Sequence, residues 1–459
     1  MDASKINLTD PEFWKGPVNV AAFAALRRDL PVSWHDFVDG PEKGMQGFWS
    51  LTRYDDIVQV SQNSGLFRNQ PSTYIGDQSE EEAQQEGWFL NMDGPRHFML
   101  RSVVQKILSP KGVEKYRQNA VGHATALVMA AKEKGEVDFA RDVAQPYPVA
   151  VICDFLGAPP SDRAHMHHLT QHALAGDAPE LGGPASVPAA FRELNDYGTA
   201  LARERRRAPK EDFVSYLHTV EVDGRRFTDE EIGMQFQLLV TAGMETTGTV
   251  GSHMMRLFME NPDQMALWAT DPDGLAPAAV EEMIRLVTPV MHMRRTAAAE
   301  TEIAGRKIAA GDKVVLWFIS GNRDETRFSQ PDRFDIRRSP NPHIGFGGGG
   351  RHTCLGAHLA RMELPILAKL ALEHLGAPEP AGEPVHVASR FANGLLSLPV
   401  RFNRGGRACP MTARPMCLRA CPRASARRSR QSCRRAARGS SGSTGWTPRP
   451  RSRPSTAAT

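Results

Sequence analysis

Cysteine is scarce in the first 403 residues, and long hydrophobic runs are absent from the whole chain of 459 residues. Cys153 and Cys354 are too few for a disulfide framework, so we expect a reducing compartment. No segment offers the ~18 consecutive apolar residues that a membrane span needs, and the N-terminus does not resemble a signal peptide. Together these absences predict a cytoplasmic protein without a membrane anchor.

Acidic residues and lysine are missing from the C-terminal segment. Residues 404–459 contain 14 Arg and no Asp, Glu or Lys, and the whole chain has a net charge of +4, so residues 1–403 carry −10. This acidic part gives no electrostatic reason to expect a nucleic-acid partner. The last segment is mostly Ala, Arg, Pro, Ser, Gly and Thr and cannot bury a core, so we expect a disordered tail after one domain, residues 1–403. Nucleic-acid binding through Arg, and zinc binding through Cys, are alternative functions of the tail.

Helical patterns dominate residues 1–403, with short strands between them. We expect helices at 53–60, 95–134 with a break near Ser109-Pro110, 189–206, 229–259, 278–287 and 355–375. We expect strands at 47–52, 313–319 and 396–402, a hairpin turn at Ala304-Gly305, and long loops at 68–88 and 176–188. These elements predict a mainly α protein with small β-sheets, an α+β fold.

The helix predicted at 229–259 is the clearest element. Thr228 and Glu231 form a capping box, and Pro262 ends the pattern. The side chains are apolar nearly all round, which is typical of a central buried helix. Gly243 and two further glycines nonetheless each cost ~1 kcal/mol relative to Ala, and Glu245 is an acid in an apolar context. Such departures inside a buried helix indicate a functional segment.

The segment 346–356, FGGGGRHTCLG, is the most informative part of the sequence. Its four glycines allow the backbone to approach a large, flat group. Cys354 is expected at the start of a helix, where free N–H groups lower the pKa of a thiol and favour the thiolate. A thiolate on such a loop suits an axial position on haem iron. For Cys354 considered alone, a buried structural cysteine is the alternative.

The same segment resembles the haem-binding loop of the cytochrome P-450 family, in its soluble bacterial form. Cys354 is preceded by His352, Gly350 and Phe346 and followed by Gly356. Phe346 stands eight residues before Cys354, whereas the commonest form of the family has seven. The resemblance covers residues 10–403. It implies the cytochrome P-450 fold with a long central helix over the haem (heme b, iron protoporphyrin IX), Cys354 as the iron ligand, and Phe346 beside the cofactor.

Two further motifs resemble this family in the expected order. Glu282-x-x-Arg285, with Arg333 downstream, resembles the family's buried Glu-Arg-Arg network, although a Glu-x-x-Arg alone is often an exposed pair. The run Ala242 to Thr247 resembles the oxygen-binding groove of the central helix. There the resemblance implies that Gly243 leaves room for O2, and that Thr246 and Glu245 are catalytic residues that deliver protons.

The resemblance also implies residues for the haem propionates and for the substrate. His97 and Arg101, one helical turn apart, match propionate contacts, and so do Arg295 and His352. Arg295 is preferred over Arg294 because strand alternation lets only one of them point inward. The residues that match the substrate pocket by family position are Trp88, Phe89, Leu239, Ala242, Val290, Met291 and Phe391.

The reaction implied by the resemblance is a monooxygenation. One atom of O2 enters a C–H or C=C bond of a hydrophobic small molecule: a steroid, terpenoid, lipid or polyketide. Electrons come from NAD(P)H through a ferredoxin reductase and a ferredoxin. The ferredoxin could dock on a basic face formed by Arg351, His352 and Arg361. We expect a monomer that binds neither membrane nor nucleic acid. The alternatives are a peroxide-using or non-hydroxylating haem-thiolate enzyme of secondary metabolism, and a non-catalytic haem protein; Glu245 and Thr246 favour O2 activation.

Overall fold

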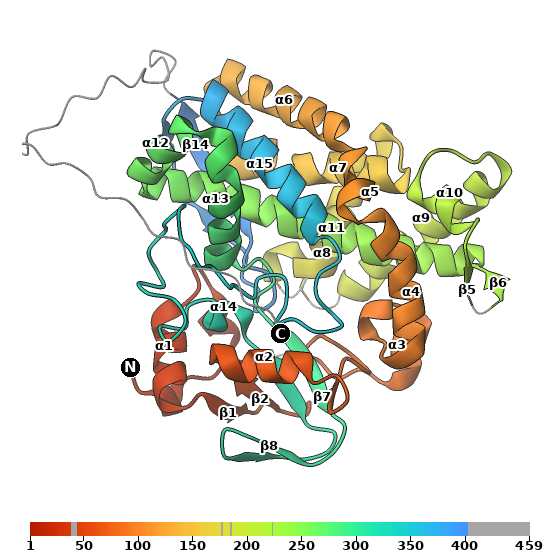
Figure 1. Cartoon of the computed structure of the whole chain (residues 1–459), viewed down its shortest axis with the longest axis vertical. Helices are drawn as coiled ribbons and strands as arrows, with labels where there is room; N and C mark the ends of the chain where they lie inside the picture. The colour runs from red at the N-terminus through yellow and green to blue at the C-terminus, as the bar shows by residue number, and fades with distance from the viewer. Residues whose placement is uncertain (38–43, 176–177, 184–185, 223, 403–459) are drawn as a thin grey trace, which may run out of the picture. The chain divides into compact units, whose positions relative to one another are not determined.

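The computed structural model describes residues 1–37, 44–175, 178–183, 186–222 and 224–402. The expected tail, 404–459, lies outside these residues, and so does part of the expected loop at 176–188. Within them, helices dominate and the sheets are small, so the predicted fold class is confirmed (Figure 1).

The bounds of the helices and strands are as follows. The helices are α1 (Val20–Asp29), α2 (Tyr54–Gln62), α3 (Glu80–Glu86), α4 (Gly94–Ile107), α5 (Pro110–Glu114), α6 (Arg117–Lys134), α7 (Pro146–Leu156), α8 (Arg163–Ala175), α9 (Val187–Arg207), α10 (Phe213–Leu217), α11 (Asp229–Glu260), α12 (Pro262–Thr270), α13 (Pro272–Val287), α14 (Phe318–Gly321) and α15 (Ala357–His374). The strands are β1 (Val32–His35), β2 (Phe48–Leu51), β3 (Phe67–Arg68), β4 (Glu136–Asp138), β5 (Glu221–Val222), β6 (Arg225–Arg226), β7 (Met293–Ala297), β8 (Thr301–Ile303), β9 (Arg306–Ile308), β10 (Lys313–Leu316), β11 (Pro378–Pro380), β12 (Val385–His386), β13 (Leu395–Ser397) and β14 (Pro399–Phe402).

Helix α11 is the central element, as its apolar sequence predicts. Its capping box is formed: the Thr228 hydroxyl accepts from the Glu231 N–H at 3.2 Å, and the Glu231 carboxylate accepts from the Thr228 N–H at 2.9 Å. The helix packs against α7, α9 and α15, and most of its residues are buried. In Figure 1 it runs behind α15, and the strands β1, β2 and β7 lie below both helices.

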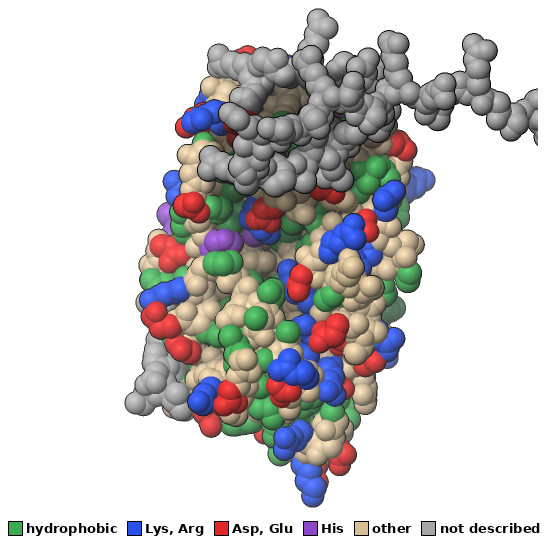
Figure 2. Space-filling model, turned by 90° about the vertical axis from the view of Figure 1, so that its left-hand side faces the viewer, with side chains coloured by type: hydrophobic (Ala, Val, Ile, Leu, Met, Phe, Trp, Pro, Cys, Tyr) green, Lys and Arg blue, Asp and Glu red, His purple; other side chains and the backbone are tan. Residues whose placement is uncertain are grey.

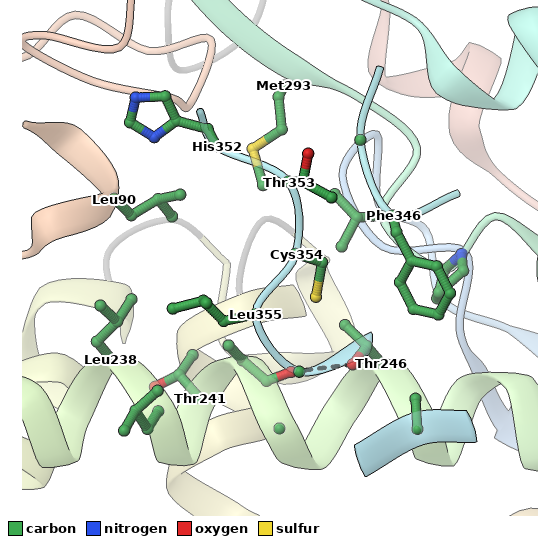
Figure 3. Close-up of a pocket in the computed structure, with 18 of the residues that line it drawn as sticks. Leu90, Leu238, Thr241, Thr246, Met293, Phe346, His352, Thr353, Cys354 and Leu355 are labelled. Carbon is green, nitrogen blue, oxygen red and sulfur yellow. Dashed lines mark hydrogen bonds between the residues drawn. The ribbon is translucent and has the colours of Figure 1, made fainter. Parts of the chain in front are cut away.

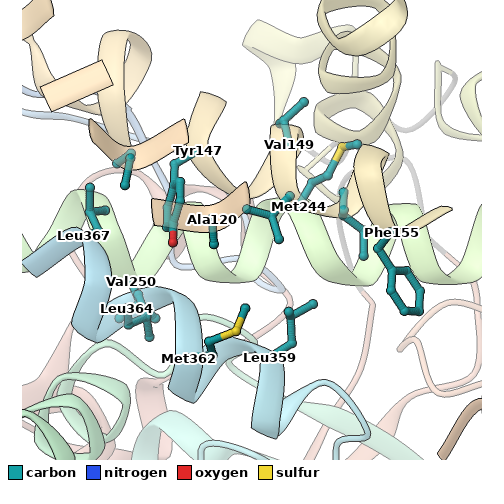
Figure 4. Close-up of a cluster of buried hydrophobic side chains, with 14 of the residues drawn as sticks. Ala120, Tyr147, Val149, Phe155, Met244, Val250, Leu359, Met362, Leu364 and Leu367 are labelled. Atoms are coloured by element: carbon teal, nitrogen blue, oxygen red, sulfur yellow. The ribbon is translucent and has the colours of Figure 1, made fainter. Parts of the chain in front are cut away.

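The main hydrophobic core lies between α6, α7, α11 and α15 (Figure 4). Tyr147 of α7 points towards Val250 of α11 and Leu364 of α15 in this core, to which Phe155 and Met244 also belong. Burying a large apolar side chain contributes roughly 1.5–3 kcal/mol. This core therefore fixes α15 against α11, and α15 begins three residues after Cys354.

Two glycines of α11 have a packing role rather than a role in chemistry. A Cβ on Gly248 would lie 3.2 Å from the Cα of Gln145, and a Cβ on Gly251 would lie 3.2 Å from the Leu367 side chain. These contacts are tighter than ordinary van der Waals contact, so the missing side chains let neighbouring backbone approach α11. The helix propensity lost at these two positions is therefore explained by the fold.

The five-stranded sheet has the order β1-β2-β10-β7-β3. Strand β10 is fully buried at its centre, parallel to β2 and antiparallel to β7. The predicted strand at 313–319 is too long, because β10 ends at Leu316 and the short helix α14 follows. The predicted hairpin turn at Ala304-Gly305 joins β8 and β9.

Two helical predictions need correction. The expected loop at 68–88 contains α3, whose Ser79 and Glu82 form a capping box that the sequence displays. Helix α13 begins at Pro272, well before the predicted residue 278, and Asp271 caps it by accepting from the Gly274 N–H at 3.0 Å. Pro277 lies inside this helix, so it does not act there as a breaker.

A buried ion-pair network joins α13 to the segment that leads towards Cys354. The Glu282 carboxylate accepts from Arg285 at 2.8 and 2.9 Å and from the Nε of Arg338 at 3.0 Å. Glu282 and Arg285 are both fully buried. The prediction that Arg333 completes this network is wrong: its side chain is exposed and donates to Gln330 Oε1 at 3.1 Å. Arg333 contributes only its backbone carbonyl, which accepts from Arg338 at 3.1 Å.

Charges of both signs are interspersed on the described part of the face that Figure 2 shows. Exposed residues form pairs such as Arg327 with Asp55 and Lys369 with Asp273. Among the described residues, no helix has both the length and the apolar character that a bilayer crossing requires.

The network gives a stability prediction. Glu282→Gln removes the anion from a site where the guanidinium of Arg285 is fully buried. We expect the free energy of unfolding to fall by about 3–5 kcal/mol, because an uncompensated buried charge remains. Denaturant unfolding followed by circular dichroism measures this loss.

Two arginine variants test which arginine belongs to the network. Arg338→Ala should destabilise the protein strongly, whereas Arg333→Ala should change the free energy of unfolding by no more than about 0.5 kcal/mol. Equal losses from the two variants would contradict the network described above.

Candidate active site

A largely apolar cavity lies between α11 and the loop that carries Cys354 (Figure 3). The other walls come from α4, α7, α13, β7 and the segments around Trp88 and Phe391. The Cys354 side chain is exposed to this interior space, and Thr246 of α11 lines the same space. The structure thus brings together two residues that are more than a hundred positions apart in the sequence.

The cysteine loop is held by its own backbone and by α2. The Cys354 N–H donates to the Phe346 carbonyl at 2.9 Å. Gly350 has a φ of +80°, and a Cβ there would lie 2.7 Å from the Ser61 carbonyl oxygen. A Cβ on Gly348 would lie 2.8 Å from the Ser61 side chain. These two glycines therefore let the loop approach α2, which differs from the predicted approach to a flat ligand.

The Cys354 thiol is under opposing electrostatic influences. Burial raises its pKa, while the N–H groups of Gly356 and Ala357 and the guanidinium of Arg101 lower it. The N–H groups at the helix start lower the pKa of Cys354 as predicted, but burial raises it by more, so the pKa is raised overall. A metal ion bound at the Cys354 sulfur would supply the missing positive charge, because coordination by a metal deprotonates a thiol outright.

Three cationic or imidazole side chains converge on one corner of the cavity. Arg101, Arg295 and His352 all line it. Arg295 donates to the Arg294 carbonyl at 2.8 Å, and burial lowers its pKa to about 10. Arg294 points to the other side of β7, where it donates to the Gly76 carbonyl at 2.8 Å. Strand alternation thus separates the two arginines as the sequence predicts.

His97 does not line the cavity; its ring stacks on the ring of His352, which does. Its ring lies 4.0 Å from that of His352 at an interplanar angle of 20°, and burial lowers its pKa to about 4. His97 Nε2 and His352 Nδ1 are buried without a hydrogen-bond partner among the described residues. On the other side of His352, the Asp93 carboxylate lies 3.4 Å from its Nε2 and accepts from the backbone N–H of Asn69 at 2.9 Å.

These features fit a haem. Buried imidazole nitrogens without partners and two arginines at one corner suit carboxylate oxygens, as on the propionates of a haem. A cysteine sulfur facing an apolar space suits the axial position of its iron. Cys354 would hold the iron, and Arg101, Arg295 and His352 would face the propionates.

The two predicted proton-delivery residues are not together. Thr246 lines the cavity, and its hydroxyl donates to the Ala242 carbonyl at 2.9 Å (Figure 3). Glu245 is buried and does not line the cavity, and burial raises its pKa to about 7. The helical rotation of about 100° per residue turns adjacent side chains apart. Gly243 borders the cavity, but a Cβ there would come within 2.9 Å of the Ile152 side chain, which fills that space.

Most of the expected pocket residues lie on the cavity wall. They are Trp88, Phe89, Leu239, Ala242, Val290 and Phe391, and Phe346 of the loop lies there too. Met291 does not: it is buried in a separate core beside Trp317, because the chain between α13 and β7 is irregular. Wall residues that the sequence analysis missed are Leu90, Ile152, Phe155, Leu174, Leu238, Thr241, Thr247, Val250 and Met293. Spacing of four residues from Gly243 and from Thr246 could have found Thr247 and Val250 on α11; the wall residues outside α11 come from elements whose packing the sequence does not reveal.

Comparison with known proteins points the same way. Residues 275–400 match the family model described as Cytochrome P450. The chain is 39% identical over 405 residues to the methyl-branched lipid omega-hydroxylase of Mycobacterium tuberculosis, which covers 87% of this chain and 95% of that one. It is 33% identical to the steroid C26-monooxygenase of Rhodococcus jostii, over 88% of this chain and 86% of that one.

A solved structure agrees in fold as well. It is a Mycobacterium marinum cytochrome P450 in complex with pseudoionone, with a TM-score of 0.81, 36% identity, and coverage of 87% of this chain and 98% of that one. Identity at this level over most of both chains shows common descent, and the named relatives are monooxygenases. This chain belongs to the cytochrome P450 family, and the haem that the family carries is the group that the cavity fits.

Proposed function

We propose that residues 1–403 form a monooxygenase domain that hydroxylates a saturated carbon of an extended, methyl-branched lipid, with electrons from NAD(P)H through a ferredoxin reductase and a ferredoxin. The observation that carries this proposal is the distribution of polarity in the cavity. Charged side chains gather in the corner of Arg101, Arg295 and His352, while most of the rest of the wall is aliphatic and aromatic.

The apolar wall suits a hydrocarbon substrate. Leu174, Leu238 and Leu239 come from α8 and α11, and the ring of Tyr74 lies 4.9 Å from that of Phe391. Such a surface binds by burying apolar area, and it offers few hydrogen-bond partners for a polar substrate. The relative named for methyl-branched lipids and the one named for a steroid both act on molecules of this kind, which supports a lipid over a polar polyketide.

The roles of the site residues follow from their positions. Cys354 binds the haem iron, and Arg101, Arg295 and His352 bind the propionates. When bound, the haem supplies the reductive activation of O2 and the transfer of one oxygen atom to the substrate. The apolar wall orients the substrate and excludes bulk water, and Thr246 offers a hydroxyl to the oxygen-binding side of the cavity.

Arg351 is the side chain that we assign to ferredoxin docking. Of the three residues expected to form a basic face, Arg361 is paired with Glu281 at 2.7 Å and His352 is buried beside Asp93. Arg351 is exposed, and no bond from its guanidinium is found to the other described residues. An acidic ferredoxin would meet a positive charge three residues before Cys354.

The absorption spectrum of the ferric protein tests the substrate class. Titration with a methyl-branched fatty acid should convert a thiolate-haem spectrum to the high-spin form, because a fitting ligand displaces the water on the iron. A straight-chain fatty acid, a steroid and a macrolide serve as comparisons. A response to the macrolide alone would overturn the lipid assignment.

The role of Thr246 can be tested against a matched hydroxyl. Thr241 also lines the cavity from α11, and its hydroxyl donates to the Gln237 carbonyl at 2.7 Å. Thr246→Ala should lower the product formed per NAD(P)H oxidised by roughly ten-fold to a hundred-fold. Thr241→Ala should leave this ratio near the wild-type value.

Wild-type turnover with hydrogen peroxide that matches turnover with ferredoxin would instead favour the peroxide-using alternative.

Reversal of one charge tests the docking of ferredoxin. Arg351→Glu should raise the KM for ferredoxin by roughly three-fold or more at low ionic strength, and added salt should reduce the difference. Arg337→Glu, at another exposed arginine, is the control. An unchanged KM in Arg351→Glu would remove Arg351 from the docking surface.

A further inference from the structure

Glu281 of α13 is a carboxylate next to the cysteine loop for which the proposed activity has no use. Its two oxygens accept from the Nε and Nη2 of Arg361 in α15, at 2.7 Å each. Burial alone would raise the pKa of Glu281, but the hydrogen bonds from Arg361 and His343 lower it to about 2. The two side chains therefore form a full ion pair in a bidentate arrangement, which fixes the plane of the guanidinium.

The guanidinium of Arg361 lies over the ring of Phe346. Its central carbon is 4.5 Å from the ring centre, within the range of a cation–π contact. Phe346 lines the cavity (Figure 3), whereas Arg361 is not part of the cavity wall, so the ring separates the guanidinium from the cavity. The Phe346 carbonyl also accepts from the Cys354 N–H at 2.9 Å. The ion pair is thus anchored to the residue that fixes the cysteine.

His343 is a second donor to the Glu281 carboxylate. Its Nδ1 accepts from the Gly345 N–H at 3.1 Å, so its hydrogen is on Nε2, which donates to Glu281 Oε2 at 2.8 Å. A ring nitrogen that accepts from an N–H carries no proton, so His343 is neutral. The cluster of Glu281, Arg361 and His343 therefore has no net charge, and it loses this balance when either charged member is removed.

The charge of Arg361 acts at the Cys354 sulfur. Burial raises the pKa of Cys354, and the positive charges of Arg101 and Arg361 oppose this rise. Arg101 donates to the Thr353 carbonyl and forms no ion pair with a carboxylate in the described part of the chain. Of these two arginines near the sulfur, Arg361 is therefore the one whose charge is offset by a paired carboxylate.

We propose that Glu281 is a positioning residue for the haem-thiolate centre: it holds the Arg361 guanidinium on the Phe346 ring, offsets its charge, and so lowers the reduction potential of the haem at Cys354. Reduction adds one electron from a redox partner to the haem, and no bond of these side chains forms or breaks. A positive charge close to the sulfur favours the added electron, and the carboxylate beside that charge works against it. This role of Glu281 rests on haem binding by Cys354 and depends neither on the lipid nor on the ferredoxin.

The reduction potential of the purified holoenzyme tests this role. Glu281→Gln leaves the charge of Arg361 without its partner, so the ratio of ferrous to ferric haem at a fixed solution potential should rise by roughly three-fold or more. Arg361→Gln leaves the anion instead, so the ratio should fall by a similar factor. Anaerobic titration with mediator dyes, followed by absorption spectroscopy, measures both ratios.

Two further variants separate charge from a disturbance of the loop. The double variant Glu281→Gln/Arg361→Gln carries neither charge and should return close to the wild-type potential. Arg361→Lys keeps the positive charge and should stay closer to the wild-type potential than Arg361→Gln does. A loop that is merely disturbed would instead shift the potential of every variant in the same direction.

Asp273→Asn is the matched control. The Asp273 carboxylate accepts from Lys369 Nζ at 2.8 Å, so this ion pair also joins α13 to α15. Lys369 lies roughly two helical turns beyond Arg361, away from the cysteine loop. Loss of this pair should leave the reduction potential at the wild-type value.

Three results would overturn the proposal. Shifts of the same sign in Glu281→Gln and Arg361→Gln, or no shift in either, would show that the charges of the pair do not act on the haem. An equal shift in Asp273→Asn would show that any contact between the two helices has this effect. Failure of both single variants to bind haem would place the pair in the folding of the loop; where one of them binds haem, the sign of its shift decides.

The proposed function and the role of Glu281 fail separately. A protein that shows the opposite shifts but oxidises no lipid would refute the proposed function and leave the role of Glu281 standing. A protein that oxidises a lipid and shows no opposite shifts would do the reverse.

Discussion

The burial of one carboxylate, Glu282, is the constraint on which the active site depends. Its charge holds Arg285 in the interior, and Arg285 donates to the carbonyl of Asn322 at 2.8 Å. The side chain of Asn322 in turn accepts from the N–H of Ile344 at 2.7 Å. Two residues later the chain reaches Phe346, whose carbonyl fixes Cys354. A series of hydrogen bonds that starts in α13 thus helps to position Cys354.

The second organising principle is the separation of charge from hydrocarbon inside one cavity. Arg101, Arg295 and His352 share a corner in which Asp93 is the nearby carboxylate. Uncompensated positive charge in a buried place is unfavourable, so an anionic ligand would stabilise this corner. The apolar remainder of the wall is left for a hydrophobic molecule. A single space therefore has a charged region and a hydrocarbon region.

Periodicity was sufficient for the fold class, and the resemblance to cytochrome P-450 was sufficient for the grouping of Cys354, Thr246 and Arg295, because that family's motifs stand in the same order in this sequence. It was insufficient where tertiary contacts decide. Arg333 and Arg338 both follow Pro331 closely, and only the path of the loop selects Arg338 for Glu282. Met291 lies in the irregular segment before β7 and Met293 begins that strand, so alternation cannot tell which one lines the cavity.

Two adjacent residues of β7 connect the charged corner of the cavity with its hydrocarbon wall. Arg295 belongs to the charged corner, while Arg294 holds the carbonyl of Gly76 and its own N–H donates to the Thr73 carbonyl at 2.8 Å. Tyr74, between these two anchor points, contributes to the hydrocarbon wall. Strand β7 is therefore fixed to the segment that carries Tyr74 and also supplies Arg295 to the charged corner. A change in β7 that displaces Arg294 would therefore move Tyr74 as well, so the hydrocarbon wall can be altered independently of the charged corner only at residues of other elements.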